Sequence, residues 1–240
     1  HLMHLSPVDG RYHNKCDALR QYCSEFGLIR YRYIVEVQWL LFLSDTVGIT
    51  DLPAMSQAQK DFLHKAQEGF SLKDAKAIKT IEQTTNHDVK AVEYFLREQL
   101  QAQDFAEIYQ SFIHFALTSE DVNNLSYGLM LKDAVSEAIV PSLEALIKDC
   151  SDKASAYSDV AMLARTHGQS ASPTTMGKEW ANIAHRLSYQ LEGLKSLEYF
   201  GKINGAVGNF NAHQVAYPDL NWPKLAASFV ESLGLAYQSH

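Results

Sequence analysis

Apolar side chains recur in this chain at steps of three and four residues, and that spacing constrains the fold more than any other feature of the sequence. The longest such series holds Leu19, Tyr22, Phe26, Ile29, Tyr33, Val37, Leu40 and Leu41. This spacing places the apolar side chains on one face of a long helix. No segment alternates apolar and polar residues between turn signals, as a half-buried strand would. The sequence therefore predicts an all-α fold.

The same pattern predicts the remaining helices. Shorter ones are expected over 56–67, 72–83, 87–101 and about 106–117, and longer ones after residue 119, from Pro141 to about Tyr157 and over about 176–199. A last helix is expected from Pro223 to about Leu233. Proline suits the first turn of a helix, where its missing N–H is no loss. We expect a small helical N-terminal domain over 1–107 and a long-helix bundle over 108–240. Because bundles return their helices to close a core, 108–240 is expected to be only the first part of that domain.

Composition excludes several classes of protein. The 240 residues are 46% apolar and 20% charged, as in ordinary folded proteins, and no apolar run reaches the roughly 20 residues that span a bilayer, so no membrane partner is expected. The net charge is −7 without any block of Lys or Arg, which argues against a nucleic-acid partner. Three cysteines without a CxxC pair are typical of reduced thiols in a cytoplasmic protein.

Two polar segments precede predicted helices. TTNHDVK contains Asn86, His87 and Asp88, and TSEDVNN contains Thr118 and Ser119. A structural interpretation is a capping box in each, from Thr85 to Asp88 and from Thr118 to Asp121. A functional interpretation uses the unpaired N–H groups of a helix N-terminus, which suit a phosphate or a carboxylate. His114 lies one turn before Thr118 and is expected to face the same space, although a lone helix histidine is more often structural.

Two further polar segments carry an arginine and a histidine. SPVDGRY predicts a turn at Asp9-Gly10 that presents Arg11, which is able to grip a phosphate in two places, and Tyr12, which can stack on a base. Alone, this segment is best read as an exposed turn. In LARTHGQSASPTT, His167 stands beside Gly168 and Gln169. Imidazole is a common general acid or base, whereas the structural alternative is a surface histidine on a loop.

Other chemistries lack their motifs here. The sequence contains no HExxH, GxSxG, P-loop or GxGxxG, and no His, Cys and carboxylate cluster with the spacing of metal ligands. We therefore expect a site without a metal or a cofactor.

Five segments together resemble one family. SPVDGRY, KTIEQTTNHDVKAVEYFL, IHFALTSEDVNNLS, RTHGQSASPTTMGKE and GKINGAVGNFNAH occur in the order and at the spacing of the adenylosuccinate lyases, above all the bacterial ones, within the fumarase/aspartase superfamily. The resemblance covers nearly the whole chain. It implies three helical domains, a homotetramer whose active sites are shared between subunits, and cleavage of N6-(succinyl)AMP to AMP and fumarate. It also implies release of fumarate from the succinyl-carboxamide ribotide SAICAR to give AICAR, an earlier step of purine synthesis.

The resemblance also implies roles for individual residues. His167 resembles the histidine that protonates the leaving nitrogen, and Gln169 resembles a substrate ligand. Arg11 and Tyr12 resemble the pair that binds the nucleotide. The remaining positions resemble residues that contact substrate, with Thr118 and Ser119 as donors to its carboxylate; they are Asn86, His87, Asp88, His114, Thr118 and Ser119.

One element of the family is missing from the printed sequence. The family's base is a serine on a mobile loop in a motif like SS-x-MP-x-K-x-NP, which lies further along than residue 240 in the family and does not occur here. The chain is thus expected to be an N-terminal portion that is inactive alone. Two alternatives stay open: a sister lyase acting on argininosuccinate, aspartate or malate, and a non-catalytic helical assembly fragment.

Overall fold

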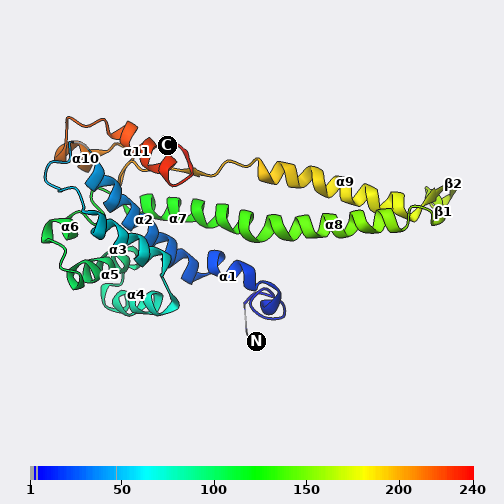
Figure 1. Cartoon of the computed structure of the whole chain (residues 1–240), viewed down its shortest axis with the longest axis horizontal. Coiled ribbons are helices and arrows are strands. Elements are labelled where there is room, and N and C mark those ends of the chain that lie inside the picture. The colour runs from blue at the N-terminus through cyan, green and yellow to red at the C-terminus, as the bar shows by residue number, and fades with distance from the viewer. Residues whose placement is uncertain (1–2, 4, 47) are drawn as a thin grey trace. The chain divides into compact units, whose positions relative to one another are not determined.

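The computed structural model describes residues 3, 5–46 and 48–240 and is built mainly of helices (Figure 1). By packing, the chain divides into unit 1, residues 1–132 and 198–240, and unit 2, residues 133–197. The boundary predicted near residue 107 lies inside unit 1 and stays a prediction. No helix in the described part of the chain is long and apolar enough to cross a membrane.

Unit 1 contains ten helices and two very short strands within its described residues. Its elements are η1 (His13–Lys15), α1 (Asp17–Cys23), α2 (Glu25–Asp45), α3 (Gln57–Glu68), α4 (Leu72–Thr85), α5 (Asp88–Ala102), α6 (Glu107–Ser111), α7 (Ser119–Ala134, which runs on into unit 2), β3 (Phe200–Gly201), α10 (Asn211–Ala216), α11 (Trp222–Ser232) and β4 (Ala236–Tyr237). The strands β3 and β4 pair in parallel. The expected helices over 56–67, 72–83, 87–101 and 223–233 are confirmed to within two residues.

Helix α2 forms the centre of unit 1. It is buried on every side, with fully covered side chains that include Tyr33, Trp39 and Leu43. The indole N–H of Trp39 donates to the carbonyl of Phe115 at 3.0 Å, and its ring meets that of Phe229 at 4.9 Å between centroids. Phe115, which lies shortly before α7, and Phe229 of α11 thus both contact Trp39. Through these contacts α2 holds the segment before α7 and helix α11 in place.

The expected single helix from Leu19 to Leu41 is wrong in one respect, because the structure breaks it into α1 and α2. Ser24 takes an extended conformation and its side chain accepts the N–H of Gly27, so it caps α2. A Cβ at Gly27 would lie 2.7 Å from the carbonyl carbon of Tyr22, so only glycine allows α1 to pass this closely. The periodicity of apolar residues continues across such a break and does not reveal it.

The helix expected over 106–117 is also wrong, because only α6 forms there. After Phe112 the chain makes turns in which His114 and Ala116 have positive φ values of 57° and 59°. These left-handed residues end the helix, since L-residues rarely adopt that conformation inside one.

Unit 2 is a pair of long helices joined by a hairpin. Its elements are η2 (Val135–Ile139), α8 (Val140–Ala156), β1 (Ala161–Thr166), β2 (Gln169–Thr175) and α9 (Met176–Lys195). The predicted helix start at Pro141 is confirmed to within one residue, since α8 begins at Val140 and has Pro141 in its first turn; the chain before it is already helical, because η2 is one π-helical stretch and Ile139 is helical. Proline cannot donate an N–H, and a π-bulge is one way in which a helix accommodates such a disturbance.

The strands β1 and β2 correct the expectation that no strand occurs. They pair antiparallel, with Thr166 opposite Gln169, so that His167 and Gly168 form a two-residue turn. Both turn residues have positive φ, 52° and 73°, as a type I′ hairpin turn requires. Figure 1 shows this hairpin at one end of the α8 and α9 pair. The all-α class still holds, since the strands are few and short.

Candidate functional site

The residues singled out in the sequence lie in both units. Arg11, Tyr12, Asn86, His87, Asp88, His114, Thr118 and Ser119 belong to unit 1, whereas His167 and Gln169 belong to unit 2.

The junction of α4 and α5 presents Asn86, His87 and Asp88. Asn86 ends α4 in a left-handed conformation, with φ of 51°. His87 caps α5, because its ring Nδ1 accepts the N–H of Lys90 at 3.1 Å. The predicted capping box from Thr85 to Asp88 is wrong: Thr85 ends α4, and its hydroxyl bonds the backbone of His87. With Nδ1 accepting, a neutral His87 ring carries its proton on Nε2, where it can face a ligand.

Asp88 joins this junction to α7 through a buried arginine. Arg32 of α2 places one nitrogen 2.8 Å from Asp88 and donates from Nε to Asn123 of α7 at 2.8 Å. Burial by itself would raise the pKa of Asp88, but the positive charge of Arg32 and the N–H of Val89 outweigh it and lower the pKa. The segments TTNHDVK and TSEDVNN are thereby held together, and Asp88 stays charged.

His114 turns toward α2 and α5. Its Nδ1 lies 2.6 Å from Oε1 of Glu36 and 3.8 Å from Oε1 of Glu93, and the ammonium of Lys90 pairs with Glu93 at 2.7 Å. Burial would lower the pKa of His114, but the carboxylates of Glu36 and Glu93 raise it. His114 does not line the pocket beside Thr118 that is described next.

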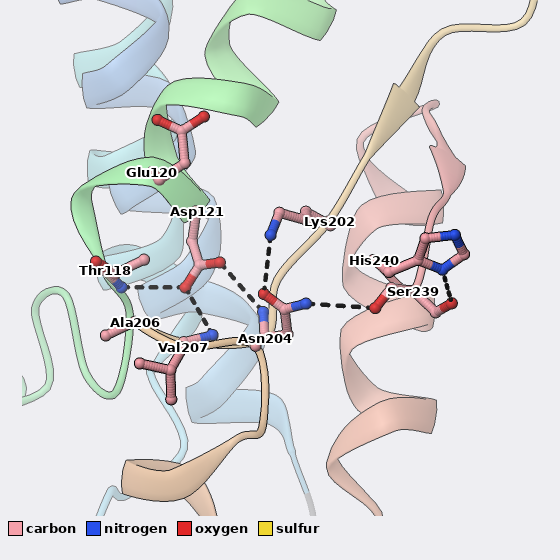
Figure 2. A pocket seen from close by; sticks show the side chains of 11 residues that line it. Thr118, Glu120, Asp121, Lys202, Asn204, Ala206, Val207, Ser239 and His240 are labelled. Atoms are coloured by element: carbon pink, nitrogen blue, oxygen red, sulfur yellow. Dashed lines mark hydrogen bonds between the residues drawn. The ribbon is translucent and has the colours of Figure 1, made fainter.

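A pocket of about 400 Å³ lies at the start of α7 (Figure 2). Its described lining is Thr118, Glu120, Asp121, Lys202, Asn204, Gly205, Ala206, Val207, Gly208, Ser239 and His240. All of these residues belong to unit 1. Ser119 begins α7 beside the pocket but is not part of its lining.

Asp121 holds this pocket in shape. One carboxylate oxygen accepts the N–H groups of Thr118 at 3.0 Å and Gly205 at 3.1 Å, and the other accepts that of Asn204 at 3.1 Å. The predicted contact between Thr118 and Asp121 is present as the hydrogen bond from the backbone N–H of Thr118 to the carboxylate of Asp121. Gly205 has φ of +79°, so the loop turns here in a conformation that suits glycine. Asp121 therefore ties the segment GKINGAVGN to the first turn of α7.

The hairpin of unit 2 exposes His167 at its turn and Gln169 at the start of β2. The register places Arg165 opposite Ser170, so the polar side chains gather around the turn. A two-residue turn holds the imidazole in a defined place while leaving it open to a partner molecule.

Arg11 and Tyr12 lie in the N-terminal turns of unit 1. The guanidinium carbon of Arg11 lies 5.3 Å from the ring centre of Tyr12, and the tyrosine side chain is exposed. The N–H of Tyr12 donates to the carbonyl of Pro7 at 2.8 Å, which closes the turn predicted from SPVDGRY.

Sequence reasoning missed several polar residues that organise these places. They are Arg32, Glu36, Glu93, Lys202 and Asn204. A signal existed for Arg32 and Glu36, since both are charged residues inside the strongly apolar helix α2, where a charge needs a partner. Lys202 had no such signal. The described residues hold no group of three or more His, Cys, Asp or Glu side chains suited to a metal ion.

Comparison with known proteins gives a consistent result. Residues 10–239 match the family described as Lyase. The chain is 50% identical over 236 residues to the adenylosuccinate lyase of Haemophilus influenzae and 49% identical over 236 residues to that of Escherichia coli K12; each alignment covers 98% of this chain and 52% of the relative. The chain thus spans about half the length of these curated relatives.

Solved structures of low sequence identity share the fold. A fumarate lyase from a Mesorhizobium species matches with a TM-score of 0.70 and 18% identity, over 93% of this chain and 49% of that one. A β-carboxy-cis,cis-muconate cycloisomerase from Acinetobacter calcoaceticus matches with a TM-score of 0.69 and 18% identity, over 92% of this chain and 49% of that one. Since the family match extends over almost all of its residues, the chain belongs to the lyase family.

Proposed function

We propose that residues 1–240 form the N-terminal half of an adenylosuccinate lyase. The enzyme would release fumarate from N6-(succinyl)AMP to leave AMP, and from SAICAR to leave AICAR. The proposal is supported above all by the 50% identity of the chain to an adenylosuccinate lyase over 236 residues. The pocket at the start of α7 offers a place for the succinyl group of the substrate. The remaining roles follow from the chemistry of this elimination.

The reaction removes a proton from a carbon of the succinyl group and then breaks the bond between the neighbouring carbon and nitrogen. The electron pair of the C–H bond becomes the C=C bond of fumarate, and the pair of the C–N bond goes to the departing nitrogen. Negative charge builds on the carboxylate next to the carbon that loses its proton. Fixed donors aimed at that carboxylate lower the barrier, because they need no reorganisation during the reaction. Thr118 and Ser119, at the N-terminus of α7, are the donors in this proposal.

The departing nitrogen needs a proton, and we assign this step to His167. A general acid contributes about 10²–10⁴-fold to rate. The type I′ turn presents the imidazole outward, and Gln169 across the turn is suited to hold the substrate beside it. The proton that leaves the succinyl carbon would go to a serine on the family's mobile loop, a segment absent from the printed sequence.

The nucleotide part of the substrate is assigned to two places in unit 1. Arg11 would pair with the phosphate and Tyr12 would stack on or bond to the nucleotide. The α4 and α5 junction would contact the substrate through Asn86, His87 and Asp88, with Arg32 keeping Asp88 in place. His114, held by Glu36, would contribute a positively charged ring.

We further propose a homotetramer in which neighbouring subunits complete each active site. Unit 2 supports this, because large apolar side chains are exposed along it, namely Leu146, Leu163, Ile183, Tyr189 and Leu197. Exposed apolar surface of this kind marks association sites. A cytoplasmic location is proposed as well, since Cys16, Cys23 and Cys150 are free thiols and such thiols persist in reducing compartments.

The test uses the natural gene product that contains residues 1–240. Incubation with adenylosuccinate is expected to yield AMP and fumarate in equal amounts, measured by chromatography. His167→Ala is expected to reduce kcat by about 10²–10⁴-fold. His185→Ala, an exposed histidine on α9 of the same unit, is the matched control and should keep the full rate.

A substrate panel separates this proposal from its alternatives. Elimination from argininosuccinate, aspartate or malate without turnover of adenylosuccinate would assign the protein to a sister lyase. Absence of any turnover, in a protein that folds, would favour a helical assembly role. If the kcat of the His167→Ala enzyme stayed within about threefold of that of the parent, His167 would not be the general acid, since a general acid is expected to contribute far more to the rate.

A further inference from the structure

The pocket at the start of α7 contains one lysine whose charge is not neutralised by an ion pair. The ammonium of Lys202 donates to Oδ1 of Asn204 at 3.3 Å, a long hydrogen bond to a neutral group. None of the described carboxylates forms an ion pair with it, whereas the seven described lysines that pair with a carboxylate all do so at 2.8 Å or less. A long bond to an amide is easily exchanged for a bond to an anion, because hydrogen bonds between charged groups are stronger.

The backbone that carries Lys202 is firmly fixed. Its N–H donates to Oδ1 of Asn124 at 2.9 Å, and its carbonyl accepts from Nδ2 of Asn124 at 3.1 Å. Asn204, two residues on, is held by Asp121 and donates from its side chain to the carbonyl of Ser239 at 3.3 Å. Only the lysine side chain is therefore left to move. A cation on a fixed backbone costs little to organise when a ligand arrives.

The acidic side chains of the pocket form no ion pair with this cation in the described part of the chain, and Lys202 acts on Asp121 only through its charge. Both oxygens of Asp121 accept backbone N–H groups, and Figure 2 shows its carboxylate enclosed by those bonds. Burial raises the pKa of Asp121, although these N–H groups and the charge of Lys202 oppose the rise. In the same view, the carboxylate of Glu120 points away from Lys202.

The opposite wall of the pocket is also suited to an anion. Thr118 lines it immediately before α7. Its own N–H is held by Asp121, and the N–H groups of the next residues, Ser119 and Glu120, belong to the first turn of the helix, where N–H groups have no backbone partner within the helix. A helix N-terminus favours negative charge, and here it shares one pocket with a lysine. The volume of about 400 Å³ lies within the range of small-molecule sites.

From this arrangement we propose that Lys202 binds a carboxylate of the succinyl group in the pocket that it shares with Thr118. The inference rests on the proposed lyase function and adds a residue that contacts the substrate. Its ammonium would neutralise the carboxylate whose charge grows as the succinyl carbon loses its proton. Lysine suits this task, since its charge sits on a flexible stem that can follow a ligand in and out.

The first experiment needs no variant. The natural gene product is treated briefly with acetic anhydride, and the acetylation of each lysine is measured by mass spectrometry with and without ligands. Succinate, a dianion, is expected to protect Lys202 by about tenfold at saturation, whereas neutral succinamide should not. Lys224, an exposed lysine near the start of α11, is the internal control and should react equally in every sample. Unprotected Lys202 in saturating succinate would overturn the proposal, as would protection by AMP alone.

The second experiment separates binding from folding. Lys202→Gln should raise KM for adenylosuccinate and Kd for succinate by about tenfold, the effect of losing one partly exposed charged hydrogen bond. Lys202→Arg should restore part of the affinity, and Lys224→Gln should match the parent. An unchanged Kd for succinate in Lys202→Gln would contradict the role. If the parent binds succinate through Lys202 but does not cleave adenylosuccinate, the proposed function fails, and what stands of the inference is that Lys202 binds a carboxylate in this pocket.

Discussion

Nδ1 of His114 lies 2.6 Å from Oε1 of Glu36, and the carboxylate of Glu36 is fully buried. Its second oxygen, Oε2, has no hydrogen-bond partner among the described residues. Burial raises the pKa of Glu36, against the opposing effect of the ring, and the carboxylates of Glu36 and Glu93 raise that of His114. The pair therefore holds one proton firmly between a histidine and an acid inside unit 1.

The free energy of unfolding is expected to depend on pH through the titration of His114 and Glu36. Both pKa values are raised in the folded state, so the folded chain holds protons that the unfolded chain releases sooner. The resulting stabilisation is complete below the ordinary pKa values and is lost as the pH rises above 6.5 through the raised pKa of His114. Glu36→Gln should reduce the free energy of unfolding at pH 6 by about 2 kcal/mol, because it removes a charged hydrogen bond from a buried site.

Urea unfolding at pH 6 and pH 9 measures the effect. The parent should lose stability between the two pH values, and Glu36→Gln should lose clearly less. Glu98→Gln, an exposed change on α5, serves as the control and should follow the parent. Equal losses in the parent and in Glu36→Gln would show that the pair does not control this titration.

Because of His213, the free energy of unfolding is expected to fall as the pH is lowered, the opposite of the effect of the His114 and Glu36 pair. It is 1% exposed, neither ring nitrogen has a hydrogen-bond partner among the described residues, and the rings of Phe210 and Trp222 lie against it. Burial lowers its pKa to about 4. The unfolded histidine therefore gains a proton at higher pH than the folded one. Stability is retained above 6.5 and falls as the pH drops toward about 4, by a total of about 3 kcal/mol.

Replacement of His213 by Phe removes this titration. The free energy of unfolding of His213→Phe should fall less between pH 7 and pH 4.5 than that of the parent, and His185→Phe on the exposed face of α9 should change nothing in this range. A parent protein whose stability loss over this interval is unaffected by His213→Phe would refute the assignment.

Two glycines of α9 should respond in opposite ways to alanine. A Cβ at Gly177 would lie 2.7 Å from Cα of Ser158, whereas a Cβ at Gly193 would meet nothing within 4 Å. Gly177→Ala should destabilise unit 2 by about 1–3 kcal/mol through overpacking. Gly193→Ala should stabilise α9 by about 0.5–1 kcal/mol, since alanine is the better helix former. Hydrogen exchange of the α8 and α9 amides gives both values, and a Gly177→Ala protein as stable as the parent would exclude the close approach.

The 240-residue chain alone is expected to release no fumarate from adenylosuccinate above background. The reason is that the serine-bearing segment expected to supply the base does not occur in its sequence. Fumarate is measured after incubation with the purified chain, whose mass is confirmed beforehand. Turnover that copurifies with this polypeptide would mean that another group removes the proton.

The sequence predicted the helices whose apolar faces are continuous. For α3, α4, α5 and α11, one face contacts the rest of unit 1, so the spacing of apolar residues and the bounds of the helix agree. The hairpin of β1 and β2 was missed because residues 161–164 are all apolar and most residues of β2 are polar, so the sequence does not alternate, although exposed and half-buried side chains alternate at the start of β1. Its turn chemistry, two residues with positive φ at His167 and Gly168, becomes recognisable only once the strands are known.

Some residues of the candidate site could be predicted from the sequence and others could not, for a physical reason. Polar residues at helix ends stand out against apolar helices, and so Asp88 and Thr118 were singled out. Arg32, which pairs with Asp88, was overlooked although a charge inside the apolar helix α2 indicates a buried partner. Lys202, which lines one pocket with Thr118, was overlooked because a single charge beside a glycine loop has many ordinary explanations. Which charges meet depends on contacts across long stretches of chain, such as that between Asn124 and Lys202, 78 residues apart.

The three bonds of Asp121 also determine when this pocket can form during synthesis. Two of its donors, Asn204 and Gly205, follow it by 83 and 84 residues. At roughly 5–20 residues per second, the ribosome needs about 4–17 seconds to make that stretch. Helices α2 and α5 are complete before Asp121 is made, but its carboxylate must wait beside an unfinished loop. The nascent chain therefore passes through a stage at which unit 1 has only the part of its core built by the first helices and lacks the pocket at the start of α7, and a chaperone or protease would meet it in that form.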